Sequence, residues 1–238
     1  MNRFILTICA AVIPALILVV YFWKSDRFPE PPKVVITTFI LGILSIIPSI
    51  FFALPFYRVL EKIQNPYLYG IWQAFMCAAV PEESAKFLVI FYYCYKHPAF
   101  DEVMDGLVYG ATASLGFAAL ENIMYVAEDG YSVAVTRALT SVPTHAFFGM
   151  FIGYYLALYK KTAVKKIGIV IKGLAIAILL HGIYDVPLLM LRRVMEVKYH
   201  VSQLFYSGCA VASGVIIYFL YRIGLGKLKK IKEQQAKF

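Results

Sequence analysis

Long apolar blocks separated by short polar connections run the whole length of the chain. A helix needs about 20 apolar residues to cross the hydrocarbon core of a bilayer, and each block is near that length. The blocks predict membrane-spanning helices over residues 4–23, 34–57, 67–95, 103–127, 133–159, 167–190 and 200–222. No connection is long enough to form a soluble domain. The pattern therefore predicts an all-α fold, a polytopic membrane helix bundle of about seven transmembrane helices.

The domain organisation follows from the same pattern. We expect residues 1–238 to form a single membrane-embedded domain, with a basic tail over residues 223–238 that lies at the membrane surface. The first block ends without an A-x-A-like cleavage site before Lys24. We therefore expect a retained helix there and not a signal peptide.

Two pairs of glycines have the four-residue spacing that places both members on one helix face. They are Gly106 with Gly110, and Gly149 with Gly153. In a membrane, small residues at this spacing let two helix backbones approach closely. These pairs predict tight helix packing and no chemistry.

Composition supports the membrane class. The chain is 61% hydrophobic and 16% charged, whereas soluble domains are about 45–50% apolar and about 25% charged. The net charge of +9 comes from basic residues near the ends of the apolar blocks, which favours a lipid bilayer and not nucleic acid as the partner. The four cysteines lie within apolar blocks and form no CxxC pair, so they predict neither a disulfide framework nor a zinc knuckle.

The distribution of Lys and Arg predicts the orientation. Seven spans put the termini on opposite sides, and these sides carry 7 and 14 Lys or Arg residues, with the larger number on the side of the C-terminus. The richer side is expected to be cytoplasmic. We therefore expect a multi-pass protein of the cell membrane, with its N-terminus outside and its C-terminus in the cytoplasm.

Few ionisable side chains lie inside the predicted spans. Each charged one costs about 2.5–3.5 kcal/mol at the centre of a membrane helix, so such residues usually face the bundle interior and mark a functional site. Glu82 and Lys86 are four residues apart and can pair along one helix face. His181 and Asp185 have the same spacing, so the carboxylate can fix the tautomer and leave one ring nitrogen for a metal or substrate. Glu83 lies about 100° around the helix from Glu82 and needs other partners.

The depths of these residues along their spans predict one shared cavity between the midplane and the outer surface. Its members would be Glu82, Glu83, Glu121, His145, His181 and Asp185. Acids and histidines in such a cavity support hydrolysis by carboxylate-activated water. They also support a zinc-type site that leaves a position for water, or a proton or ion relay. The residues alone leave these chemistries open.

Three sequence motifs resemble those of the PrsW family of intramembrane proteases. EESAK, with Glu82, Glu83 and Lys86, is similar to the EExxK motif of that family. FAALE, ending at Glu121, is similar to FxxxE, and HGIYD, from His181 to Asp185, is similar to HxxxD. The three motifs follow one another in the same order as in that family, and each lies on a separate predicted span. The resemblance covers roughly residues 65–190. The related CAAX prenyl endopeptidases and the Abi group carry a histidine in the second motif, so Glu121 favours the PrsW branch.

The resemblance implies an intramembrane endopeptidase that makes the first cut in a membrane-anchored anti-sigma factor or a similar single-pass protein. Glu82 and Glu83 would be the catalytic acid/base pair. The catalytic residues expected on this basis are Glu82, Glu83, Glu121, His181, Asp185 and Lys86. If a metal takes part, zinc held by Glu121, His145 and His181 is the expectation, although the sequence lacks the HExxH signature and also allows a metal-free site.

Two alternatives use the same helices. A CAAX-type prenyl-protein endopeptidase acts on cytosolic proteins and would need the cavity to open toward the cytoplasm. A proton-coupled transporter or receptor would keep the pocket without the hydrolysis, and it predicts that Glu82→Gln abolishes pH-coupled flux. Inverted repeats would favour a transporter, and the sequence contains none that we detect. The sequence does not give the oligomeric state.

Overall fold

The computed structural model describes residues 3–163 and 166–236, and these contain helices and no strand. The elements are α1 (Arg3–Ser25), α2 (Pro32–Leu44), α3 (Ile46–Leu60), α4 (Pro66–Trp72), η1 (Gln73–Ala79), α5 (Val80–Val89), η2 (Ile90–Cys94), α6 (Val103–Asp129), α7 (Tyr131–Leu139), α8 (Ser141–Lys161), α9 (Ile167–Glu196) and α10 (Gln203–Gln235). Elements η1 and η2 are π-helices.

The predicted all-α membrane bundle is confirmed. Among the described residues, five helical stretches are long and apolar enough to cross a membrane: Ile8–Ser25, Pro32–Leu60, Val103–Glu128, Ile167–Glu196 and Gln203–Gln235. The other two predicted spans, 67–95 and 133–159, are also helical but interrupted. The first contains both π-helices. The second is broken at Thr140, so the long helix of that region begins at Ser141 and not at 133 as expected.

Helix α10 continues through most of the predicted basic tail and ends at Gln235. Residues 237 and 238 of that tail, and residues 164 and 165 of the loop before α9, lie outside the described residues.

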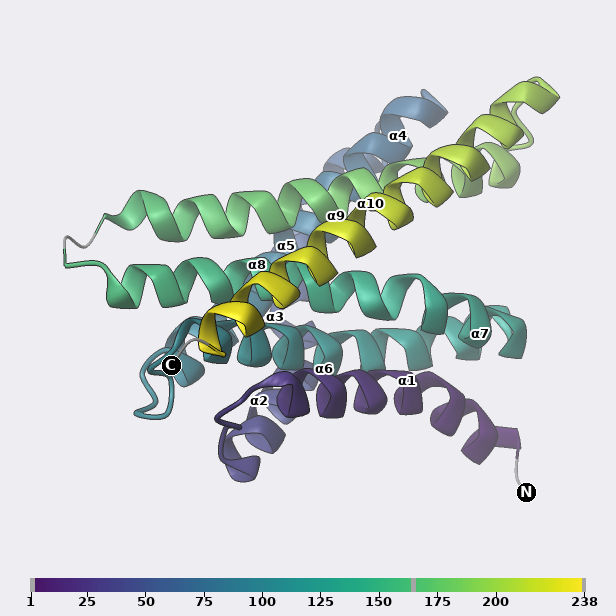
Figure 1. Cartoon of the computed structure of the whole chain (residues 1–238). Helices are drawn as coiled ribbons and strands as arrows, with labels where there is room; N and C mark the ends of the chain where they lie inside the picture. The colour runs from purple at the N-terminus through teal and green to yellow at the C-terminus, as the bar shows by residue number, and fades with distance from the viewer. Residues whose placement is uncertain (1–2, 164–165, 237–238) are drawn as a thin grey trace.

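Helix α6 lies in the middle of the bundle and contacts α1, α2 and α8 (Figure 1). Its side chains from Met104 to Ala119 are buried on every face. Both predicted glycine pairs lie in the contact between α6 and α8. A Cβ atom added at Gly153 would lie 1.7 Å from the carbonyl oxygen of Gly106, and one at Gly149 would lie 2.1 Å from that of Gly110. The prediction of tight packing is confirmed.

The segment that carries the first motif has an unusual backbone. Asn65 caps α4 by accepting from the backbone amides of Tyr67 and Leu68, each at 3.0 Å. The π-helix η1 then ends directly before α5, in which Pro81 has no amide hydrogen for the helical ladder. A second π-helix follows α5. Helical turns of this kind occur frequently at functional sites, and here they flank Glu82, Glu83 and Lys86.

The two ends of the bundle differ in what they hold. The start of α1, the α6–α7 junction and the α9–α10 loop lie at one end, which we call the α7 end (right in Figure 1). The α1–α2 loop, the start of α6 and the end of α10 lie at the other, which we call the C-terminal end.

Candidate active site

Four helices bring the predicted site residues together. Helix α5 provides the EESAK motif, α6 provides Glu121, α8 provides His145, and α9 provides His181 and Asp185. Side-chain contacts join these helices into one polar chain. It runs in the order Glu121, His145, Lys86, Glu83, His181, Asp185, and each link is 3.2 Å or shorter.

Lys86 is the centre of this chain and is fully buried. Its Nζ lies 2.9 Å from Oε1 of Glu83 and 3.3 Å from Oε2 of Glu82. The same atom lies 3.0 Å from Nδ1 of His145 and 4.1 Å from the centre of the Phe117 ring. Phe117 is the first residue of the FAALE motif, so its ring covers the buried ammonium through a cation–π contact.

His145 has partners on both ring nitrogens. An ammonium group can only donate, so Nδ1 of His145 accepts from Lys86 and the ring hydrogen lies on Nε2. That Nε2 lies 3.1 Å from Oε2 of Glu121 and donates to it. Glu121 is held on its other side by Arg137, whose Nη2 lies 2.6 Å from the same oxygen. The tautomer of His145 is therefore fixed by a cation on one nitrogen and a carboxylate on the other.

His181 lies between carboxylates. Its Nδ1 is 2.8 Å from Oε1 of Glu83, and its Nε2 is 3.2 Å from Oδ2 of Asp185. Without a metal ion this arrangement suits a doubly protonated ring, because an ionised carboxylate only accepts hydrogen bonds. Phe148 stacks on the ring at a centroid distance of 5.0 Å and fixes its plane. The predicted pairing of His181 with Asp185 is present.

The two adjacent glutamates have different environments. The side chain of Glu83 is 0% exposed and that of Glu82 is 14% exposed. Glu82 lines a cavity of about 230 Å³ together with Glu121, His145, His181 and Asp185. Water that enters this cavity can therefore reach the carboxylate of Glu82 but not that of Glu83.

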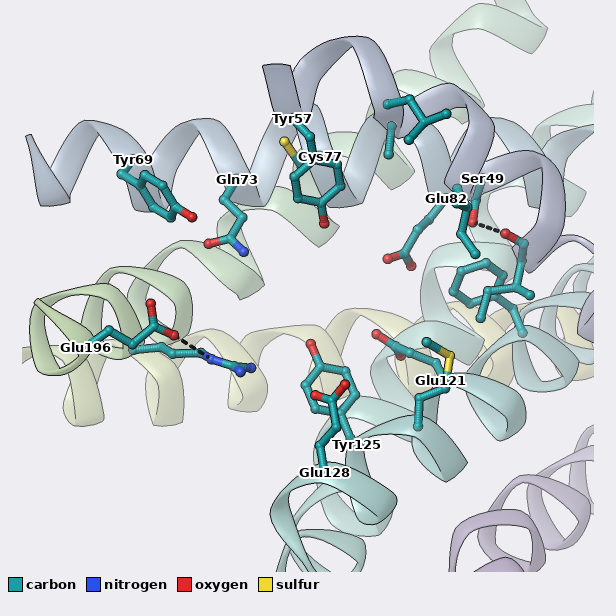
Figure 2. A pocket seen from close by; sticks show the side chains of 17 residues that line it. Ser49, Tyr57, Tyr69, Gln73, Cys77, Glu82, Glu121, Tyr125, Glu128 and Glu196 are labelled. Carbon is teal, nitrogen blue, oxygen red and sulfur yellow. Dashed lines mark hydrogen bonds and ion pairs between the residues drawn. The ribbon is translucent and has the colours of Figure 1, made fainter. Parts of the chain in front are cut away.

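A larger groove of about 460 Å³ continues from the cavity and shares Glu82 and Glu121 with it. In Figure 2 the carboxylates of these two residues face each other across it. Tyr57, Tyr69 and Gln73 lie on one side of the groove, and Tyr125 and Glu128 lie on the other. Glu128 and Glu196, which also lines the groove, are near the ends of α6 and α9, so the groove opens toward the α7 end.

The sequence analysis missed Arg137 and Asn122. Arg137 is one of the seven Lys and Arg residues counted for the side of the N-terminus, yet its side chain is only 14% exposed and pairs with Glu121. Its Nε also donates to Oδ1 of Asn122 at 2.8 Å, and Asn122 in turn donates to the backbone oxygen of Ala11. An arginine within the predicted fifth span was the available signal.

A metal ion fits the donor groups of this site. Glu82, His145 and His181 can each offer one atom, and these atoms lie within 4.8 Å of one another. Two histidines and one carboxylate are a catalytic zinc ligand set. Glu121 and Glu83 lie against the two rings, as carboxylates do behind metal-binding histidines. In addition, Oε2 of Glu83 is buried without a hydrogen-bond partner in the described part of the chain. This set has Glu82 where the sequence analysis expected Glu121.

Comparison with known proteins agrees with the motifs. A sequence model described as PrsW family intramembrane metalloprotease matches residues 30–220. A protease PrsW from Geobacillus kaustophilus is 36% identical over 188 residues, which cover 78% of this chain and 81% of that protein. A protease PrsW from Bacillus subtilis is 37% identical over 180 residues, which cover 75% of this chain and 80% of that protein. A protease PrsW from Clostridioides difficile is 28% identical over 234 residues, which cover 95% of this chain and 92% of that protein. No solved structure gives a significant match. The chain belongs to the PrsW family of intramembrane metalloproteases.

Proposed function

We propose that this protease cuts a single-pass membrane protein, such as a membrane-anchored anti-sigma factor, with Glu82 as the residue that activates water. The observation that carries the proposal is the difference between the two adjacent acids: Glu82 reaches the cavity, whereas Glu83 is buried against Lys86 and His181. A group that takes a proton from water must be reachable by water.

The chemistry assigned to these residues is peptide hydrolysis. The carboxylate of Glu82 takes a proton from water as the water oxygen forms a bond with the scissile carbonyl carbon. Oε2 of Glu82 lies 4.0 Å from Nε2 of His181, which lines the same cavity and can donate to the oxyanion that develops. Glu82 then returns the proton to the amide nitrogen as the carbon–nitrogen bond breaks.

We propose zinc as the metal, held by Glu82, His145 and His181. In the zinc-bound state Glu82 would hold the ion instead of taking the proton from water itself. Nε2 of His181 would give up its proton and its contact with Asp185, and Nδ1 of His145 would give up its contact with Lys86. When bound, such an ion supplies Lewis-acid activation of water or of the carbonyl group. The role of Glu83 is then to hold His181 and Lys86 in place. Glu121 acts in the same way on His145, whereas the contact of Asp185 with Nε2 of His181 belongs to the metal-free state.

The substrate side of the proposal rests on the groove. The groove lies between α3 and α6 and leads from the α7 end to Glu82. On one side of the groove, Tyr57, Tyr69 and the amide of Gln73 offer hydrogen-bonding groups for an unwound peptide segment. The distribution of Lys and Arg predicts that the α7 end faces outside, because that side carries 7 of these residues against 14. With the groove open to the outside, we expect the protease to cut a single-pass protein on the external side of the membrane. The anti-sigma factor as substrate comes from the family resemblance.

The test uses the full-length protein in detergent and a tagged single-pass substrate of the anti-sigma type. Removing a general base typically costs 10²–10⁴-fold in rate, so Glu82→Gln is expected to reduce cleavage by about 10³-fold. The matched control is Glu233→Gln on α10, where the glutamate side chain is 63% exposed. It is expected to cleave as wild type does.

Each outcome has a defined meaning. Sensitivity of the wild type to a chelator, restored by zinc, would assign Glu82 to the metal set. Cleavage that depends on Glu82 but resists the chelator would assign direct proton transfer to it. Cleavage by Glu82→Gln at the wild-type rate would refute the proposal.

A further inference from the structure

A second group of acids lies at the C-terminal end of the bundle, away from the candidate active site. It consists of Asp26 and Glu30 in the α1–α2 loop and Asp105 in the first turn of α6. All three residues are buried: Asp26 is 5% exposed, Glu30 is 4% exposed and Asp105 is 2% exposed. Each can offer one carboxylate oxygen, and these oxygens lie within 4.8 Å of one another. We call this group the acidic cluster.

No basic residue of the described chain pairs with the acidic cluster. In the described residues, no Lys or Arg forms a salt bridge with any of its three carboxyl groups. Lys24 and Lys232 line a neighbouring hollow with Asp26 but do not pair with it. Three buried carboxylates so close together repel one another strongly in a medium of low dielectric constant. Their negative charge must be compensated by protons or by a bound cation.

Hydrogen bonds within the described residues hold Asp26 and Glu30 in place but leave one buried carboxylate oxygen without a partner. Oδ1 of Asp26 accepts from the backbone amide of Phe28 at 3.0 Å and from the side-chain amide of Gln235 at 2.8 Å. The hydroxyl of Tyr109 donates to Oε2 of Glu30. Oδ2 of Asp26, in contrast, is buried and has no hydrogen-bond partner in the described residues. A buried carboxylate oxygen without a partner indicates a missing ligand.

We propose that the acidic cluster is a binding site for a hard divalent cation, Ca²⁺ or Mg²⁺, formed by Asp26, Glu30 and Asp105. The donor set contains only oxygen, which these ions prefer over nitrogen and sulfur. Ca²⁺ binds oxygen at about 2.3–2.6 Å, so oxygens on opposite sides of it lie roughly 4.6–5.2 Å apart. The three oxygens of the cluster lie within 4.8 Å of one another, so one ion of this size can reach all of them with little movement of the side chains. Mg²⁺, which is smaller, would draw the oxygens slightly inward.

The site would join three parts of the chain. The α1–α2 loop and α6 provide the ligands, and the side-chain amide of Gln235 at the end of α10 connects Asp26 with Glu102, each at 2.8 Å. Binding would therefore tie the last turn of α10 to the middle of the bundle.

Terbium luminescence tests the site directly. Tb³⁺ binds oxygen sites of this kind and emits when a nearby aromatic residue is excited. Two such residues touch Glu30: Tyr109 through its hydroxyl, and Trp23 through a 2.7 Å hydrogen bond from its Nε1 to the Glu30 carbonyl oxygen. Full-length protein in detergent, stripped with EDTA, would be titrated with Tb³⁺ and then with Ca²⁺ or Mg²⁺ as competitor. The more effective competitor identifies the ion.

The variants separate this site from the candidate active site. Asp26→Asn removes one negative ligand and is expected to weaken Tb³⁺ binding about tenfold or more. Glu82→Gln disturbs the candidate active site and is expected to leave the emission unchanged. The competing ion should also raise the melting temperature of wild type and Glu82→Gln, but not that of Asp26→Asn, because only a protein that binds the ion is stabilised by it.

Three results would overturn the proposal. They are no emission and no thermal shift in wild type, an unchanged response in Asp26→Asn, or loss of the response in Glu82→Gln. If Asp26→Asn does not fold, Glu30→Gln replaces it in both measurements. A cluster compensated by protons alone would give the first of these results.

Discussion

The contact between α6 and α8 is so close that one added methyl group is expected to disrupt it. A Cβ atom at position 153 would lie 1.7 Å from the carbonyl oxygen of Gly106, whereas ordinary van der Waals contact begins at 3.4 Å. The backbones would have to separate locally by the difference, about 1.7 Å. Overpacking typically costs about 1–3 kcal/mol when side chains can move. Here the obstacle is backbone, so the upper end of that range applies to Gly153→Ala.

The helix propensity of alanine opposes this cost by about 1 kcal/mol relative to glycine. The net expectation for Gly153→Ala is a loss of about 2 kcal/mol in the free energy of unfolding. The control is Gly226→Ala on α10, where a Cβ atom meets nothing within 4 Å. It should be neutral or slightly stabilising.

Unfolding in detergent by a titration with SDS, followed by tryptophan fluorescence, measures the difference. Activity supplies a second readout, because Nε2 of His145 on α8 donates to Oε2 of Glu121 on α6 across 3.1 Å. A shift of about 1 Å in a catalytic site can reduce the rate about 10²-fold. If Gly153→Ala unfolds at the same SDS fraction as Gly226→Ala, the close contact between the two backbones does not exist.

Two further predictions concern charge. Arg137→Gln leaves Glu121 without its 2.6 Å ion pair, so it is expected to lower the free energy of unfolding by up to about 3 kcal/mol and the cleavage rate at least tenfold. Arg137→Lys should recover part of both losses. Wild-type stability and cleavage in Arg137→Gln would contradict this role. For the orientation, a cysteine-free variant would carry either Glu196→Cys or Lys229→Cys, at positions that are 47% and 79% exposed. A membrane-impermeant maleimide should label Glu196→Cys in intact cells and Lys229→Cys only after the membrane is opened, and the opposite pattern would mean an inverted protein.

Periodicity within a single helix was sufficient to predict much of the site. The four-residue spacing of Glu82 and Lys86, and of His181 and Asp185, predicted two pairs that the structure contains at 3.3 and 3.2 Å. Both pairs depend only on the geometry of one helix. The same reasoning predicted the glycine contacts, because small residues at this spacing have few other uses inside a membrane.

Contacts between helices could not be predicted in this way. The 2.8 Å contact between Glu83 and His181 joins α5 to α9, and no sequence spacing encodes it. Arg137 looked like a residue at a membrane boundary, but the break at Thr140 places it on the short helix α7, beside Glu121. Asp26 and Glu30 lie in a short polar connection between two apolar blocks, and this pattern does not predict burial. Their burial results from the packing of α6 and α10 against that loop.

The polar chain offers a physical reason for two adjacent acids in the first motif. Residues 82 and 83 differ by about 100° around the helix, so their side chains face different surroundings. Glu83 is buried and holds Lys86 at 2.9 Å and His181 at 2.8 Å. Glu82 shares Lys86 at 3.3 Å and still reaches the cavity. One carboxylate could not be fully buried within the network and open to water at the same time. The division of these two tasks between neighbouring residues is what lets a charged site persist inside the membrane and remain available for hydrolysis.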